Sequence, residues 1–190
     1  MKKKTVRNAR EDSTLAADAD TDTQEKEIAN AENGREDRLE KLAKNHILAS
    51  MGVGLIPIPI VDLVALTGIQ LTMLKKISAE YDIPFRQDLG KSLITSLTGG
   101  FLSVFVGVNL ASFIKWVPLV GQTAGAVTMP VLAGASTYAI HKVFVQHFES
   151  GGTFLDMDPS RVKDYFAEQF KKGKEVADDL NTEQSAKTTE

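Results

Sequence analysis

The sequence predicts an all-α protein built from membrane-associated helical hairpins, with an amphipathic C-terminal helix and disordered tails. The first observation behind this prediction is an uncharged run over 92–114, which one lysine separates from a second uncharged run over 116–140. About 20 helical residues span the ~30 Å hydrocarbon core of a bilayer, so each run is long enough to cross it. A surface helix of a soluble protein rarely stays uncharged for that length, because one of its faces meets water.

The second observation is the distribution of charge along the 190 residues. Charged side chains are concentrated before residue 47 and after residue 148, whereas residues 47–148 contain six basic and four acidic residues. The net charge is −3 and no basic stripe is present, which argues against a nucleic-acid partner. The chain has no cysteine, which excludes disulfides, thiolate metal sites and a cysteine nucleophile.

We expect four parts along the chain: a disordered polar arm over 1–35, a membrane helical domain over 36–157, an amphipathic helix over 158–180 and a disordered tail over 181–190. The N-terminal arm carries almost no large apolar side chain, so it cannot bury enough surface to offset the entropy of ordering. We expect no cleaved signal peptide, because no apolar stretch follows the initial lysines.

The first apolar block, over 47–74, contains a double-proline turn. Pro57 and Pro59 predict one helix over 47–55 and a second over 59–81, because proline suits the first turn of a helix and disfavours helix in the residue before it. We expect these helices to form a re-entrant or half-depth hairpin in the bilayer, with one continuous kinked span as the alternative.

The second hairpin consists of the uncharged runs over 92–114 and 116–140, and we expect it to be transmembrane. Lys115 and Trp116 mark its far interface, where a lysine can extend to water and an indole sits in the aromatic belt. Basic residues in the 75–91 loop place this loop and both termini in the cytoplasm under the positive-inside rule.

Small residues recur every four positions on both helices of the second hairpin. They allow helix backbones to approach closely where lipid offers no hydrophobic drive to associate. We favour packing of the hairpin against itself, and contact with a partner helix or a second copy, hence a homo-oligomer, is the alternative. These residues are Gly99, Ser103, Gly107, Ala111, Gly121 and Gly125.

Asp62 is the only acidic residue inside an apolar block, and ionisable residues within a membrane are candidates for function. It lies in the first turn of the helix opened by Pro59, where the helix dipole favours a carboxylate, so we interpret it as a cap-type residue. Gln70, Asn109 and Gln122 are interpreted as interhelical hydrogen-bond partners in preference to a transport path.

No residue pattern indicates catalysis, a cofactor or a metal ion, so the sequence predicts a protein that is not an enzyme. Gly90-Lys91-Ser92 looks like the end of a phosphate loop, but Phe85 stands where that loop needs a glycine, and no predicted strand precedes it. The histidines are not spaced as a metal pair, and no Ser-His-Asp grouping is visible.

The C-terminal helix is predicted to begin at Asp158-Pro159-Ser160, after Ser150-Gly-Gly ends the preceding helix. Its apolar residues recur at spacings of three and four, which indicates an amphipathic helix. We expect it to pack on the cytoplasmic face of the protein, and docking to a partner or to the membrane surface is the second interpretation. The candidate docking residues are Tyr165, Phe166 and Phe170.

Two segments of the chain resemble a bacterial family of membrane domains. The first is Gly54-Leu-Ile-Pro-Ile-Pro-Ile-Val-Asp62 with Gln70, Met73 and Tyr81, and the second is Val117-Pro-Leu-Val-Gly121-Gln with Thr137-Tyr-Ala-Ile and Phe148-Glu-Ser-Gly-Gly. Over about residues 45–157 the chain is similar to the YcjF-like membrane domain of unknown function, which is often fused to or found beside Era-like small GTPases. The resemblance implies a helical module of the bacterial inner membrane without assigned catalytic residues, and a small GTPase as candidate partner. This chain has no phosphate loop, so a nucleotide switch would come from the partner.

The sequence therefore predicts a non-enzymatic anchor or scaffold that associates with the lipid bilayer and binds a small GTPase or another membrane protein. Two alternatives remain open. One is an oligomeric pore or permeability factor with Asp62 in a water-filled path. The other is a soluble helical bundle that buries its long apolar helices.

Overall fold

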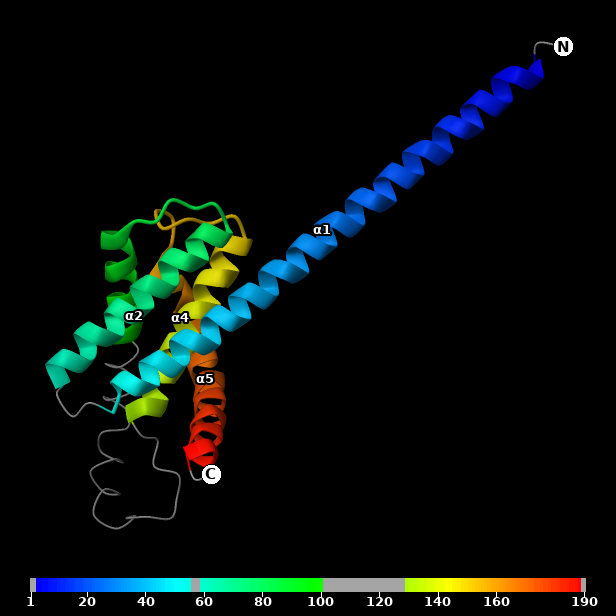
Figure 1. Ribbon diagram of the computed structural model, residues 1–190. Coiled ribbons are helices and arrows are strands. Elements are labelled where there is room, and N and C mark those ends of the chain that lie inside the picture. Colours follow the sequence, from blue (N-terminus) through cyan, green and yellow to red (C-terminus); the bar gives the residue numbers. More distant parts are fainter. Residues whose placement is uncertain (1–2, 56–58, 101–128, 189–190) are drawn as a thin grey trace. The chain divides into compact units, whose positions relative to one another are not determined.

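The computed structural model describes residues 3–55, 59–100 and 129–188 (Figure 1). These residues form the helices α1 (Lys3–Val53), α2 (Pro59–Glu80), α4 (Met129–Glu149) and α5 (Pro159–Thr188). A further helical segment covers residues 87–100. No strand occurs in the described ranges, which confirms the predicted all-α class for this part of the chain.

The chain divides into two units, Met1–Glu40 and Lys41–Glu190. The first unit is helical from Lys3, where we expected disorder over 1–35. This segment contains several Ala, Glu and Lys residues, which favour helix even without burial, and composition arguments about burial do not take that preference into account. The tail expected to be disordered from residue 181 is likewise the last part of α5, which continues to Thr188.

The second unit is a bundle whose helices run between two ends (Figure 1). At the lower end of Figure 1, α1 ends and both α2 and α4 begin. At the upper end, residues 81–86 connect α2 to the helical segment over 87–100, and residues 150–158 connect α4 to α5. Both α5 and α2 pack against α4, which therefore occupies the centre of the contacts.

The helix starts and the first turn follow the predictions from proline. α2 begins at Pro59, as predicted, and α1 ends at Val53, two residues before the predicted end, while Pro57 lies outside the described residues. α5 begins at Pro159, and Oδ1 of Asp158 accepts a hydrogen bond from the backbone N–H of Ser160 at 2.9 Å. Asp158 is thus the N-cap that satisfies one of the donors at the start of α5.

The end of α4 is a glycine cap, as Ser150-Gly-Gly predicted. Gly151 has a φ of 81°, and its N–H donates to the Phe148 carbonyl at 2.9 Å. The N–H of Gly152 donates to the His147 carbonyl at 3.0 Å. These two bonds form a Schellman motif, in which a left-handed residue lets the chain turn back and satisfy the last carbonyl groups.

The end of α2 uses the same cap with an aspartate in place of glycine. Asp82 has a φ of 54°, a conformation that aspartate tolerates better than most non-glycine residues. Its N–H donates to the Ala79 carbonyl, and the N–H of Ile83 donates to the Ser78 carbonyl at 2.8 Å. Pro84 follows, so the helix cannot resume immediately.

The predicted transmembrane hairpin lies largely outside the described residues, because 101–128 are not described. Its first part is helical to residue 100, and its last part is the beginning of α4. Within the described ranges, no helix combines the length and the apolar character that crossing a bilayer requires.

The core of the second unit contains an apolar group from α1, α4 and α5: Ala43, Ile47, Met51, Val131, Ala177 and Leu180. Two glycines allow these helices to approach closely. A Cβ on Gly134 would lie 2.8 Å from Cγ of Met51, and a Cβ on Gly173 would lie 2.9 Å from the Ala135 carbonyl oxygen. Both distances are shorter than an ordinary van der Waals contact, so the helices can lie this close only because positions 134 and 173 are glycines without a side chain.

Candidate functional site

A buried group of polar side chains joins α1, α2 and α4, and we call it the polar cluster. Its members are Ser50, Gln70, Ser136 and Thr137, each at most 4 % exposed. Gln70 donates one amide N–H to Oγ of Ser136 and the other to Oγ1 of Thr137, both at 3.2 Å. Oγ of Ser50 lies 2.7 Å from Oγ1 of Thr137, and either hydroxyl can donate. Three helices therefore share one hydrogen-bonded group.

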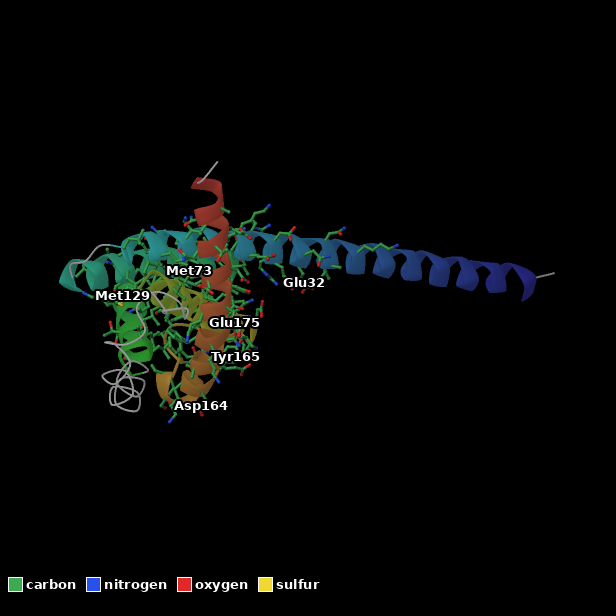
Figure 2. All side chains as sticks on the ribbon, turned by 90° about the horizontal axis from the view of Figure 1, so that it is seen from below. Glu32, Met73, Met129, Asp164, Tyr165 and Glu175 are labelled. Carbon is green, nitrogen blue, oxygen red and sulfur yellow. The ribbon has the colours of Figure 1, made fainter. Side chains whose placement is uncertain are left out.

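Apolar side chains surround the polar cluster. Met73 and Ile140, close to it in α2 and α4, are fully buried, and Figure 2 shows Met73 among the side chains of the bundle. Hydrogen bonds are strong in such an environment, and a buried polar atom left without a partner costs about 1–3 kcal/mol. The cluster thus holds the register of three helices. Gln70 has the interhelical role that the sequence predicted, while Asn109 and Gln122 lie outside the described residues.

Large apolar side chains are exposed at the end of the bundle where α1 ends and α2 and α4 begin, and we call this the apolar end. Leu55 is 73 % exposed, Val64 71 % and Met129 58 %. The elements meet closely here, because a Cβ on Gly54 would lie 2.9 Å from both the Met129 carbonyl oxygen and Cα of Pro130. Single exposed apolar residues are common, and these three are considered together because they come from the elements that meet at this end.

Aromatic side chains close the opposite end of the bundle. The ring of Phe148 lies 5.7 Å from that of Phe144 and 5.2 Å from that of Phe154, both in edge-to-face arrangements. The ring of Tyr81 lies 6.0 Å from that of Phe148, and its hydroxyl donates to Oε1 of Glu149 at 2.9 Å. These contacts attach both connections at this end to α4, and each aromatic pair adds about 0.5–1.5 kcal/mol beyond its buried area.

The connection between α4 and α5 is held by its own hydrogen bonds. Oδ1 of Asp156 accepts from the N–H of Thr153 at 2.6 Å and from its hydroxyl at 2.8 Å. These bonds lower the pKa of Asp156, and the adjacent His147 adds to the effect. His147 donates from Nε2 to the Thr153 carbonyl at 2.9 Å, and its ring lies where a side chain on Gly152 would be. The arrangement is structural, since its groups satisfy one another.

The comparison with known families places these features in a recognised domain. Residues 21–175 match a family described as a domain of unknown function, DUF697. The chain belongs to the DUF697 family. It is also similar to "Magnetosome membrane protein 22" of Magnetospirillum gryphiswaldense, with 40 % identity over 145 residues that cover 76 % of this chain and 74 % of that protein. No solved structure matches the chain.

The DUF697 match includes every residue of the polar cluster and of the apolar end. It agrees with the resemblance to a domain of unknown function that the double-proline turn indicated.

Of the six small residues singled out in the sequence, only Gly99 lies among the described residues, so the predicted packing role of the others stays a prediction. Gly99 faces open space, and the other five, from Ser103 to Gly125, lie outside the described residues. The close approach occurs instead at Gly134 of α4 and Gly173 of α5. Sequence analysis missed this pair because one glycine lies in a highly charged helix, where a small-residue pattern is not conspicuous.

The three candidate docking residues of α5 pack within the bundle. Phe166 is 1 % exposed and Phe170 4 %, and their rings lie 6.3 Å apart, while Tyr165 is half-buried. Burial raises the pKa of Tyr165. This corrects the docking interpretation for Phe166 and Phe170, because their buried side chains are not available to a partner. For Tyr165, which is half-buried, docking stays a prediction. The packing interpretation of the same helix agrees with the structure.

The other residues considered for a chemical role in the sequence are Asp62 and Gly90-Lys91-Ser92. Asp62 lies in the first turn of α2, as predicted, and its side chain is not among those described. Gly90 lies inside the helical segment over 87–100, where a Cβ would be 3.2 Å from the Leu71 side chain, so Gly90-Lys91-Ser92 is helix and not a phosphate loop. In the described part of the chain, no group of three or more His, Asp or Glu side chains is placed to hold a metal ion.

Proposed function

We propose that this DUF697 protein is a membrane-associated helical scaffold with no catalytic activity of its own. The observation that carries the proposal is the convergence of uncharged helical stretches at the apolar end. Apart from Asp62, there is no Lys, Arg, Asp or Glu in residues 45–55, 59–74, 92–100 or 129–140, which are the parts of α1, α2, the 87–100 segment and α4 toward this end. The part of α5 that packs beside them, from Gly173 onward, is charged. The opposite half carries the charged connections over 75–91 and 141–158.

Two further observations support membrane association. Leu55, Val64 and Met129 expose apolar surface at the uncharged end, and water is a poor environment for such a group. The relative with 40 % identity is described as a magnetosome membrane protein, and we extend membrane association, without its organelle, to this chain. The polar cluster then serves to keep in register the three helices whose ends form this surface.

Vesicle flotation of the full chain tests the association. A contact made by apolar side chains is insensitive to salt, whereas electrostatic binding is screened beyond ~10 Å at 0.1 M salt. We expect the protein to float with uncharged phosphatidylcholine vesicles in both low and high salt. Absence from the vesicle fraction in both conditions would contradict the proposal, and binding lost in high salt would contradict the apolar mechanism.

For the protein in cells, we propose the cytoplasmic face of the bacterial inner membrane, with both termini in the cytoplasm. The basic residues of the 75–91 loop support this orientation through the positive-inside rule. Carbonate extraction should leave the tagged protein in the membrane pellet. Protease added to the cytoplasmic side of inverted vesicles should remove both tags, and protection of either tag would refute the orientation.

We further propose that the scaffold recruits a small GTPase, as the resemblance around the double-proline turn suggests. The surfaces available for this purpose are polar. The outer face of α5 carries exposed Lys163 and Lys171, and the connection after α2 carries exposed Arg86. Phe166 and Phe170 of α5 are excluded from this role by their burial.

Capture of an Era-like GTPase on vesicles that carry the full chain tests this partner. The GTPase is offered in its GDP form and with a non-hydrolysable GTP analogue. We expect the vesicles to retain the GTPase in one nucleotide state. Retention should be lost with at least one of two charge-reversed scaffolds, the double variant Lys163→Glu/Lys171→Glu or the single variant Arg86→Glu. No retention in either state by vesicles with bound scaffold would refute the partner while leaving membrane association intact.

A further inference from the structure

We infer that the apolar end is the lipid-contacting surface of the protein, that Leu55, Val64 and Met129 enter the interfacial region of one leaflet, and that α5 stays in water. This inference rests on the proposed membrane association and adds to it a defined surface, depth and orientation. The lipid bilayer is the occupant, and the contacting chemistry is the boundary between head groups and acyl chains.

The positions of the three side chains along their helices define a shallow layer. Met129 is the first residue of α4, and Leu55 follows directly after the turn that ends α1. Val64 follows the first residue of α2 by five positions, about 7.5 Å along the axis at ~1.5 Å per residue. Helices that lie on membranes bury apolar side chains about 5–10 Å into the same boundary, so one shallow insertion accommodates all three.

Charged side chains on the same helices lie beyond this layer. Lys75 follows Val64 in α2 by eleven residues, and Lys142 follows Met129 in α4 by thirteen, which correspond to about 16 and 20 Å. Asp62 is the exception, and its place in the first turn of α2 suits a carboxylate at a wet interface. As far as α2 and α4 are concerned, the apolar end can therefore enter the boundary without taking a lysine out of water.

The charged side chains of α5 determine how the bundle is tilted relative to the membrane plane. Its residue Ala177 lies beside Gly134 of α4, close to the level of the apolar end. The neighbouring Glu175 and Asp179 are exposed, and Figure 2 shows Glu175 on α5. Transfer of unpaired carboxylates into an apolar medium is strongly unfavourable. The insertion is therefore shallow, with α2 and the end of α1 toward the lipid and the outer face of α5 in water.

The chain itself indicates a bilayer as the occupant of this surface. It leaves the described residues at 100 and returns at Met129, both toward the lower end of the bundle in Figure 1. Residues 101–128 contain one charged residue, Lys115, so a stretch of bilayer-compatible composition begins and finishes where the apolar side chains are exposed. The net charge of −3 offers no general attraction to anionic lipid, so apolar contact has to supply the binding.

The absence of cysteine from the chain permits a direct test by single-site labelling. Leu55→Cys, Val64→Cys and Met129→Cys are each labelled with an environment-sensitive fluorophore in the full chain and bound to phosphatidylcholine vesicles. Leu155→Cys is the matched control, because Leu155 is 75 % exposed in the connection at the opposite end. Asp179→Cys reports on the outer face of α5. All five positions are exposed or on the surface, so the variants should fold.

We expect severalfold quenching by brominated phosphatidylcholine at positions 55, 64 and 129, with protection from iodide in the water. Positions 155 and 179 should show the opposite. If vesicle-bound protein is quenched by iodide at the first three positions, the inferred surface is wrong while membrane association stands. Blue-shifted emission there without bromolipid quenching would mean that residues 101–128 or a second copy cover the surface, which also overturns the inference. Failure to bind vesicles at all would overturn the proposed function as well.

Discussion

Replacement of Thr137 by valine should destabilise the bundle by removing the centre of the polar cluster. Thr137 is fully buried, accepts a hydrogen bond from Gln70 at 3.2 Å and lies 2.7 Å from the hydroxyl of Ser50. Valine keeps the shape but loses both bonds. At about 0.5–1.5 kcal/mol for each bond, the free energy of unfolding should fall by about 1–3 kcal/mol. For a unit of this size, that is a decrease in Tm of roughly 2–12 °C.

Urea unfolding and thermal melting followed by far-ultraviolet circular dichroism would measure the change. Thr95→Val is the matched control, because Thr95 is exposed and bonds only to the Lys91 carbonyl of its own helix, and it should change stability by less than about 0.5 kcal/mol. The double variant Ser50→Ala/Thr137→Val should be less destabilised than the sum of the single variants by about 1 kcal/mol, since neither partner is then left unsatisfied. Strict additivity, or a Thr137→Val protein as stable as the control, would refute the assigned role of the cluster.

Three further predictions concern packing and pH. Gly173→Ala should destabilise the protein by about 1–3 kcal/mol in urea unfolding, because the new methyl group would meet the backbone of α4. Gly68 has open space around it, so Gly68→Ala is the control and should stabilise α2 by about 0.5–1 kcal/mol. A stabilised Gly173→Ala protein would contradict the close approach of α5 to α4. Phe166→Ala should lower the free energy of unfolding by about 3–5 kcal/mol and Leu155→Ala by less than about 0.5 kcal/mol, and equal effects would show that the α5 aromatic face is not buried. Burial lowers the pKa of His46, with Lys76 adding to the effect against a hydrogen bond to the Leu42 carbonyl. The unfolded chain therefore binds a proton more readily, stability should fall as the pH drops below about 6.5, and His46→Gln should reduce that pH dependence in urea titrations; an unchanged slope would argue against this assignment.

Local signals in the sequence were sufficient to predict where several helices begin and end. Pro59 and Pro159 each stand at the first residue of a helix, and Gly151 has the left-handed conformation that ends α4. These features act through the backbone of a few neighbouring residues, so no knowledge of the fold is needed. The all-α class and the uncharged character of the parts of α1, α2 and α4 toward one end also followed from the sequence.

Tertiary structure decided which of these residues meet. Ser50 and Thr137 are 87 positions apart, and their hydrogen bond exists only because α1 and α4 pack with one register. Gly173 lies in a charged helix, and only the packing of α5 on α4 shows why a side chain would not fit there. The helical periodicity of α5 was compatible with Phe166 contacting a partner or packing in the core, because periodicity identifies an apolar face but not what covers it. The structure shows that Phe166 is buried in the core. Pairings between distant residues depend on the combined packing of all helices, and no local pattern contains that information.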